Sequence, residues 1–250
     1  MKINIHAGHN PDGKMACGAV GIIKESTEAR KVKDLVIKYL KSDGHTVYDC
    51  TVDDGTSASN VLSKIVTKCN AHTVDIDVSI HFNSGANDKS GNGTTTGTEV
   101  LVYSKTSKSN DEATRICNKL SAIGFKNRGI KVRKDLYFLK HTKAPSLLIE
   151  ICFVDDKDDV KLYNKNIDKI AKTIAEAIVN KKISTNTVSS VKYIVTASAL
   201  NIRKGSGTKY ATTGQVYKKG TEVTVTQYNS SKTWGLTNKG WVSMEYLKKV

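Results

Sequence analysis

Residues 1–10, "MKINIHAGHN", determine how the rest of the chain is interpreted. Apolar side chains occupy alternate positions from Met1 to Ala7, as in a strand with one buried face, and His6 and His9 lie at its end. In open sheets covered by helices, ligands bind at the carboxyl ends of the strands. This stretch therefore predicts a buried first strand whose end contributes imidazoles to a site.

Strand-like and helix-like patterns alternate from this stretch to residue 180, which predicts an α/β domain over residues 1–180 with a mostly parallel sheet flanked by helices. Alternating or continuous apolar runs predict strands at 2–6, 45–50, 75–82, 98–103 and 146–154. Apolar stripes at helical spacing predict helices at 26–44, 57–71, 111–124 and 158–182.

The chain changes character after this domain. Residues 181–191 are rich in Ser, Thr and Asn without periodicity, which is typical of a linker. Residues 192–250 carry short alternating strands separated by glycine turns, and they predict a small all-β barrel or sandwich. Its strands are expected at 193–197, 199–204, 222–228 and 239–244.

Charge and composition indicate the kind of partner. The net charge is +15, from 39 basic and 24 acidic residues, and only five of the basic residues are Arg. From Lys181 onward, twelve Lys and Arg side chains oppose two Glu, so this part holds +10 of the +15. Because nucleic-acid readers use Arg for bidentate contacts, a Lys-rich surface predicts an anionic polymer as partner and not a nucleic acid.

Several features of the sequence bear on export, membrane insertion and disulfide bonds. The first residues lack the features of a signal peptide, and no apolar run approaches the roughly 20 residues of a membrane span, so neither ordinary export nor membrane insertion is expected. The five cysteines are scattered, without CxxC spacing, and predict neither a disulfide scaffold nor a thiolate zinc site. Nothing in the sequence indicates an oligomeric state.

Three predicted strands and one helix supply residues suited to chemistry. His9 and His81 lie at strand ends, and Glu150 lies inside an apolar run, where an unpaired carboxylate is costly. Around the axis of the first predicted helix, Glu25 lies close to the centre of the apolar stripe, whereas Glu28 lies near its edge. Two His and one Glu suit a catalytic zinc with a water in the fourth position, and burial would raise the pKa of Glu150 into the range of a general base.

The other histidines have weaker interpretations. His6 and His141 are expected in a supporting or substrate-contacting position near the site, and His45 and His72 are expected to be structural. A strand-end histidine considered alone is more often structural than a metal ligand, so the prediction depends on convergence of the set.

In order along the chain, "INIHAGHN", "GIIKES", "VSIHFNSG" with "GTEVLVY", and "APSLLIEICFVDDKDD" resemble the zinc-dependent N-acetylmuramoyl-L-alanine amidases of the Amidase_3 type. The resemblance covers residues 1–180 and implies that His9, Glu25 and His81 bind Zn²⁺ and that Glu150 is catalytic. It further implies cleavage of the amide between N-acetylmuramic acid and the L-alanine of the stem peptide by zinc-activated water.

This chain departs from the family pattern at two places. The family usually has Asp at the position of His6 and Gly-Gly at Asn10 and Pro11, so the partner of the first zinc ligand is in question. His6 is expected either to hydrogen-bond near the site or to act as an alternate ligand. The family's common arginine in the helix before the second histidine strand is also missing.

The last part of the chain resembles a bacterial SH3 (SH3b) wall-binding domain in "LNIRKGSGTKY", "YKKGTEVTV" and "WGLTNKGWVSMEYL". The resemblance implies a peptidoglycan ligand, with Tyr210, Trp234, Trp241 and Tyr246 as candidate contacts. The competing interpretation is a plain barrel whose two tryptophans are core residues.

These resemblances predict a peptidoglycan hydrolase and, more specifically, a phage endolysin for a Gram-positive wall. Such a protein is expected to be made in the bacterial cytoplasm and to act at the wall after release. Two alternatives stay open: a zinc endopeptidase that cuts within the stem peptide or crossbridge, and a non-catalytic wall-binding protein. A cysteine hydrolase using Cys17 or Cys152 is a weaker alternative, because neither thiol has an identified base partner.

Overall fold

The computed structural model describes residues 1–183, 191–229 and 231–250, and the chain divides into two compact units. Unit 1 comprises Met1–Ile183 and unit 2 comprises Ser184–Val250. Most of the predicted linker, residues 184–190, lies outside the described residues.

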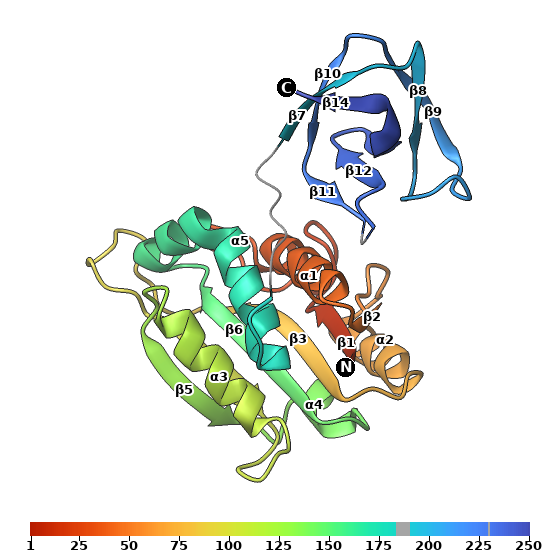
Figure 1. Cartoon of the computed structure of the whole chain (residues 1–250). Helices are drawn as coiled ribbons and strands as arrows, with labels where there is room; N and C mark the ends of the chain where they lie inside the picture. The colour runs from red at the N-terminus through yellow and green to blue at the C-terminus, as the bar shows by residue number, and fades with distance from the viewer. Residues whose placement is uncertain (184–190, 230) are drawn as a thin grey trace. The chain divides into compact units, whose positions relative to one another are not determined.

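Unit 1 is built on a six-stranded sheet with the order β2-β1-β3-β6-β4-β5 (Figure 1). All neighbouring strands are parallel except β4 and β6, which are antiparallel, so the predicted mostly parallel sheet is confirmed. The strands are β1 (Lys2–Ala7), β2 (Thr46–Asp49), β3 (Ile76–Asn83), β4 (Thr98–Val102), β5 (Asn127–Val132) and β6 (Ser146–Phe153).

Helices cover both faces of this sheet. The larger core joins one face to α1 (Glu25–Ser42), α3 (Asn110–Ser121) and α5 (Lys157–Val179), which lie together in Figure 1. A smaller core joins the other face to α2 (Ala58–Asn70) and α4 (Tyr137–His141).

Strand alternation gives the sheet one apolar face and a second face, here called the polar face, that carries polar side chains together with a few apolar ones such as Leu101 and Leu148. In β1, Ile3 and Ile5 belong to the larger core, whereas Asn4 and His6 are directed to the opposite face, as expected from a period of two. In the neighbouring β3, apolar and polar side chains alternate between the two faces in the same way. The Asn4 side chain donates to Asp77 Oδ1 at 2.7 Å, which joins the two strands. The polar face is the one covered by α2 and α4.

The sequence patterns missed two elements of unit 1. The edge strand β5 has intermediate or exposed residues throughout, so no buried alternation marks it. The five-residue helix α4 is too short for a helical stripe to be recognised.

Unit 2 contains strands in two sheets, with the orders β10-β7-β14 and β11-β12-β13-β8-β9 (Figure 1). Its core includes Val195, Ile202 and Val242. The all-β prediction is confirmed for the described residues, but they form two separate sheets and show no closed barrel. The strands are β7 (Val191–Val195), β8 (Ala199–Arg203), β9 (Thr212–Lys218), β10 (Glu222–Val225), β11 (Gln227–Tyr228), β12 (Trp234–Thr237), β13 (Gly240–Ser243) and β14 (Leu247–Lys249).

The prediction of four strands in this part was therefore incomplete. Strands β9, β12 and β14 were not expected, and a single 3₁₀ turn, η1 (Met244–Tyr246), separates β13 from β14. Most residues of β9 are exposed, and β14 has three residues, so neither gives a strong hydrophobic pattern.

Candidate active site

Three side chains from separate elements meet beside the carboxyl ends of β1 and β3. His9 follows β1, Glu25 begins α1, and His81 lies near the end of β3. Glu25 Oε1 lies 2.8 Å from His81 Nδ1 and 3.3 Å from His9 Nε2. One ligand atom from each residue can be chosen so that all lie within 4.8 Å of one another. The convergence expected from strand ends and helix phase is present.

Two glycines make this close approach possible. A Cβ on Gly8 would lie 2.0 Å from an atom of the His81 ring, and a Cβ on Gly18 would lie 2.6 Å from Glu25 Oε2. His9 itself has a φ of +66°, in the left-handed region that non-glycine residues rarely adopt. The backbone is thus shaped so that the two imidazoles and the carboxylate can share one space.

The local environment keeps Glu25 charged. Its Oε2 accepts a hydrogen bond from the Ala19 amide at 2.8 Å, and its Oε1 accepts one from the Phe82 amide at 3.2 Å. Burial by itself would raise the pKa of Glu25, but hydrogen bonds with His81 and His9 outweigh it and hold the pKa well below its usual range. A buried carboxylate with two imidazoles is a donor set suited to a divalent transition metal.

The chemistry of this donor set fits zinc. Zinc commonly accepts imidazole nitrogen and carboxylate oxygen, and three protein ligands leave one tetrahedral position open for water or substrate. His9, Glu25 and His81 are therefore the residues that could hold the metal.

Glu150 lies next to this group on β6. It pairs in register with His81 on β3 and with Glu99 on β4, so its side chain shares the polar face with His81. Burial, followed by the negative charges of Glu25 and Glu99, raises the pKa of Glu150 well above its usual value, and Arg133 opposes this shift. A carboxyl group in this environment can hold a proton at neutral pH and release it when a cation binds nearby.

A cavity of about 390 Å³ opens onto His9, His81 and Glu150. Its walls come from the polar face of the sheet and from helices α2 and α4, and they are mostly apolar, with Arg133 and Asp135 as the charged pair at the wall. The apolar wall residues include Val61, Leu62, Ile65, Leu136, Phe138 and Leu148.

His6 and His141, which were both expected near the site, have different environments in the structure. His6 lines the same cavity, but it is 2% exposed, packs edge-on against Phe138, and has no hydrogen-bond partner for Nε2 within the described chain. His141 is exposed at the end of α4, where its ring packs on Tyr137, and it does not line the cavity.

His45 and His72 have structural contacts away from the cavity. His45 Nδ1 lies 3.0 Å from the amino terminus, and the ring of His72 stacks on Tyr48.

Two supports of the site were missed in the sequence. Arg30 Nη2 on α1 donates to the His9 carbonyl at 3.0 Å and to Asp53 at 2.6 Å, which fixes the turn after β1. The Asn10 side chain donates to the carbonyls of Met15 and Gly55. The rarity of arginine in this lysine-rich chain was the available signal for Arg30, because Arg presents several fixed donors where Lys does not.

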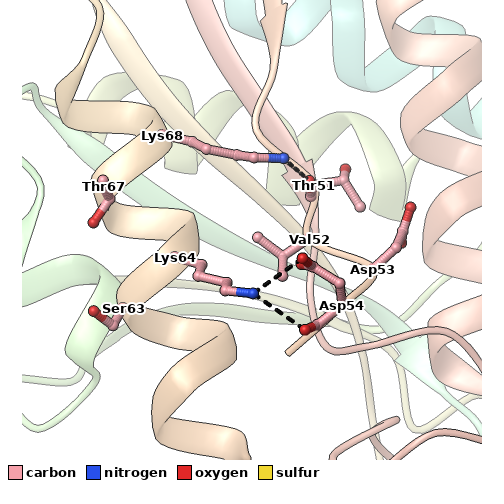
Figure 2. Close-up of a pocket in the computed structure, with 8 residues that line it drawn as sticks. All are labelled: Thr51, Val52, Asp53, Asp54, Ser63, Lys64, Thr67 and Lys68. Atoms are coloured by element: carbon pink, nitrogen blue, oxygen red, sulfur yellow. Dashed lines mark hydrogen bonds and ion pairs between the residues drawn. The ribbon is translucent and has the colours of Figure 1, made fainter. Parts of the chain in front are cut away.

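A second, larger cavity of about 520 Å³ lies between the segment after β2 and helix α2 (Figure 2). Its charged groups already have partners within the chain: Lys64 pairs with Asp54 at 3.0 Å, Lys68 donates to the Thr51 carbonyl at 2.6 Å (Figure 2), and Asp53 pairs with Arg30. It also lacks imidazoles. The smaller cavity at Glu150 is therefore the better candidate for catalysis.

The acidic stretch after β6 has a structural role. Asp155 accepts from the amides of Gly85 and Asn87, and Asp156 caps α5 by accepting from the amides of Asp158 and Asp159. These bonds hold the loop after β3 against the start of α5.

Two of the four aromatic candidates of unit 2 line one groove. Trp234 and Tyr246 line a groove of about 440 Å³, which we call the aromatic groove, whereas Tyr210 and Trp241 are not among its lining residues. The Tyr210 ring lies under the Lys209 ammonium group at 5.5 Å.

Among the described residues, no helix combines the length and the apolar character that crossing a membrane requires.

Comparison with known proteins gives an independent view of unit 1. The N-acetylmuramoyl-L-alanine amidase family model matches residues 3–180. An uncharacterized protein of Clostridium perfringens is 39% identical over 188 residues, which are 74% of this chain and 54% of that protein. The chain thus spans about half the length of that relative.

Two further relatives have informative names. The endolysin of Bacillus phage SPP1 is 29% identical over 215 residues, covering 81% of this chain and 67% of the endolysin. The solved catalytic domain of CD27L endolysin, which targets Clostridia difficile, is 32% identical with a TM-score of 0.65 and covers 74% of this chain and 99% of that domain.

Proposed function

This chain belongs to the N-acetylmuramoyl-L-alanine amidase family through residues 3–180, and from that premise we propose that it is a zinc-dependent, endolysin-like peptidoglycan amidase. The proposed reaction is hydrolysis of the amide between N-acetylmuramic acid and the L-alanine of the stem peptide. The observation that carries the proposal is the convergence of His9, Glu25 and His81 beside Glu150 in one cavity. The endolysin names of two relatives support the same class of activity.

The proposed chemistry is divided between the metal-binding set, His9, Glu25 and His81, and the neighbouring Glu150. His9, Glu25 and His81 would hold zinc, and Arg30 fixes the turn that carries His9. Zinc bound there supplies a Lewis acid that polarises a carbonyl and lowers the pKa of a coordinated water toward about 7.

Glu150 is the proposed general base and acid. Its carboxylate accepts the proton of the attacking water and then donates that proton to the nitrogen of the leaving L-alanine. Burial raises the pKa of Glu150, which favours the protonated form needed in the second step. The mostly apolar walls of the cavity lower the local polarity around these groups, which strengthens their electrostatic interactions.

The test uses the full chain and purified peptidoglycan. Glu150→Gln removes the base, so kcat should fall by about 10²- to 10⁴-fold while zinc content stays at the wild-type level. Glu112→Gln is the control, because Glu112 lies on α3 and pairs with Arg115 outside the cavity. Full activity in Glu150→Gln would contradict the assigned role.

Mass spectrometry of the digest identifies the bond that is cut. An amidase releases intact stem peptides with a free L-alanine amine and leaves glycan strands without them. Fragments cut inside the stem peptide or crossbridge would show an endopeptidase instead. Activity that survives a chelator would contradict zinc dependence.

We also propose that unit 2 is an SH3b-like wall-binding domain. The support is its all-β structure, the aromatic groove with Trp234 and Tyr246, and its net positive charge, which attracts anionic wall polymers. Co-sedimentation of the chain with purified walls tests this part, and loss of sedimentation on truncation before Ser184 is the expected result.

A further inference from the structure

Unit 2 combines a large excess of positive charge with a carboxylate that has no cationic partner. From residue 184 onward there are ten Lys and Arg side chains but only two acidic ones, Glu222 and Glu245. Glu222 pairs with Lys192 at 2.7 Å. Within the part of the chain that the structure describes, Glu245 makes neither an ion pair nor a hydrogen bond through its carboxylate. The basic side chains of the unit therefore leave this carboxylate available.

Glu245 lines the aromatic groove together with Trp234, Tyr246 and Arg203. It is the middle residue of the 3₁₀ turn η1, and both of its neighbours are fixed by backbone hydrogen bonds. The Met244 amide donates to the Thr233 carbonyl at 2.9 Å, and the Tyr246 carbonyl accepts from the Thr196 amide at 3.0 Å. The turn thus presents the carboxylate from a well-anchored backbone.

The positive group in the groove is already occupied elsewhere. Arg203 Nη1 donates to the carbonyls of Thr208 and Tyr210, at 3.1 and 2.7 Å, and the guanidinium makes no ion pair with Glu245. Arg203 therefore leaves the Glu245 carboxylate free to meet a ligand group of positive charge.

The two aromatic rings of the groove are also free of cations. Elsewhere in unit 2, Lys209 covers the ring of Tyr210 and Lys239 covers the ring of Tyr217, each at 5.5 Å. No such contact is found for Trp234 or Tyr246 among the described residues. A carboxylate without a cationic partner, in a groove lined by aromatic rings that carry no cation, is a combination suited to binding an ammonium group.

We propose that the aromatic groove binds a primary ammonium group carried by a peptide, with the Glu245 carboxylate as its counter-ion and Trp234 and Tyr246 beside it. The proposal rests on the proposed function for the origin of that peptide, which is the peptide part of peptidoglycan. Two sources carry this chemistry: the side-chain ammonium of a diamino acid and the terminal ammonium of a free peptide end. The groove would then select a cationic group on a domain whose overall charge favours anions.

Tryptophan fluorescence of the full chain can measure this binding directly. The chain has two tryptophans, Trp234 and Trp241, and both lie in unit 2. The probes are Nα-acetyl-Gly-Gly-Lys amide, which has only a side-chain ammonium, and triglycine amide, which has only a terminal one. The same peptides with their amines acetylated are the ligand controls.

We expect saturable binding of at least one ammonium probe and at least tenfold weaker binding of its acetylated form. The probe that binds more tightly identifies the source. Glu245→Gln should weaken binding of that probe at least tenfold, whereas the matched Glu222→Gln variant should stay within twofold of wild type. Tyr246→Leu provides a second test of the groove, with an expected threefold or greater loss.

The proposal is overturned if neither ammonium probe binds, if acetylated peptides bind as tightly, or if Glu245→Gln binds like wild type. Far-UV circular dichroism and the emission spectrum of each free variant establish that it is folded. Wall co-sedimentation distinguishes the two proposals. A chain that binds the ammonium probe but not walls refutes wall binding alone, and a chain that binds walls but not the probe refutes the ammonium site alone.

Discussion

The buried imidazole of His6 should make the stability of unit 1 sensitive to acid. Burial, and next the neighbouring His81, lower the pKa of His6 from 6.5 to about 3, although the Ala7 carbonyl and Asp49 act in the opposite direction. In the unfolded chain this imidazole is protonated below about pH 6.5. Between pH 6.5 and 3 the unfolded state therefore binds one more proton than the folded state, and stability falls as the pH falls.

The size of the effect follows from the shift in pKa. Each unit of difference corresponds to about 1.4 kcal/mol, so the full effect of His6 approaches about 5 kcal/mol near pH 3. Between pH 8 and pH 5 the expected loss is about 2 kcal/mol, because only the range below the unfolded pKa contributes.

The comparison is between wild type and His6→Phe at the two pH values. Phenylalanine can keep the edge-on contact with Phe138, whose ring centroid lies 4.7 Å from that of His6, but it cannot be protonated. The other titrating groups of unit 1 are shared by both proteins and cancel in the difference. A chelator is included throughout, because metal binding has its own pH dependence.

Two optical signals separate the units in one urea titration. The helices lie in unit 1, apart from the short turn η1, so far-UV circular dichroism follows unit 1. Both tryptophans lie in unit 2, and all six histidines lie in unit 1. Tryptophan fluorescence therefore follows a unit without histidine, whose stability His6 does not affect. Wild type should lose about 2 kcal/mol more than His6→Phe by circular dichroism. Equal losses in the two proteins would refute the assignment of a buried neutral His6.

Three other substitutions test the site and its support. Gly8→Ala places a Cβ 2.0 Å from the His81 ring, so the ring must move and zinc affinity, measured by chelator competition, should fall at least tenfold. Glu25→Gln replaces the charged ligand by a neutral amide, and zinc stoichiometry after dialysis should drop below half of the wild-type value. Asp156→Ala removes the cap of α5 and the acceptor of Thr96, and the free energy of unfolding by circular dichroism should fall by about 2 kcal/mol. An unchanged value in any of these measurements contradicts the contact on which it rests.

The sequence predicted the central strands because their side chains are buried in a regular pattern. In β1 and β3 the period of two marks one apolar face, and β6 is a continuous apolar run interrupted by Glu150. Strand ends and helix phase were then sufficient to bring His9, His81 and Glu25 together. The burial pattern of a strand and the direction of the side chains in the first turn of a helix both depend on residues close in sequence. Local patterns are therefore sufficient to predict them.

The rest of the site depends on contacts between distant segments. The cavity wall combines Leu62 of α2 with Phe138 of α4, and no local pattern indicates that these helices are neighbours. Arg30 reaches the His9 carbonyl across 21 positions of sequence, and its role depends on how α1 packs on β1. The exposed side chain of His141 could not be distinguished from a cavity residue, because α4 itself was not recognised.

The two faces of one sheet explain why stability and chemistry are linked in this chain. Ile3 and Ile5 have no exposed surface and belong to the larger core, and His6 alternates with them on the opposite face. A shift of β1 by one residue would exchange these faces, burying a polar row against α1 and turning apolar side chains toward the cavity. The register that pairs His6 with Ser79 is therefore required by the core and by the site at once. For this reason a strand pattern followed by His9 carried information about both the fold and the function.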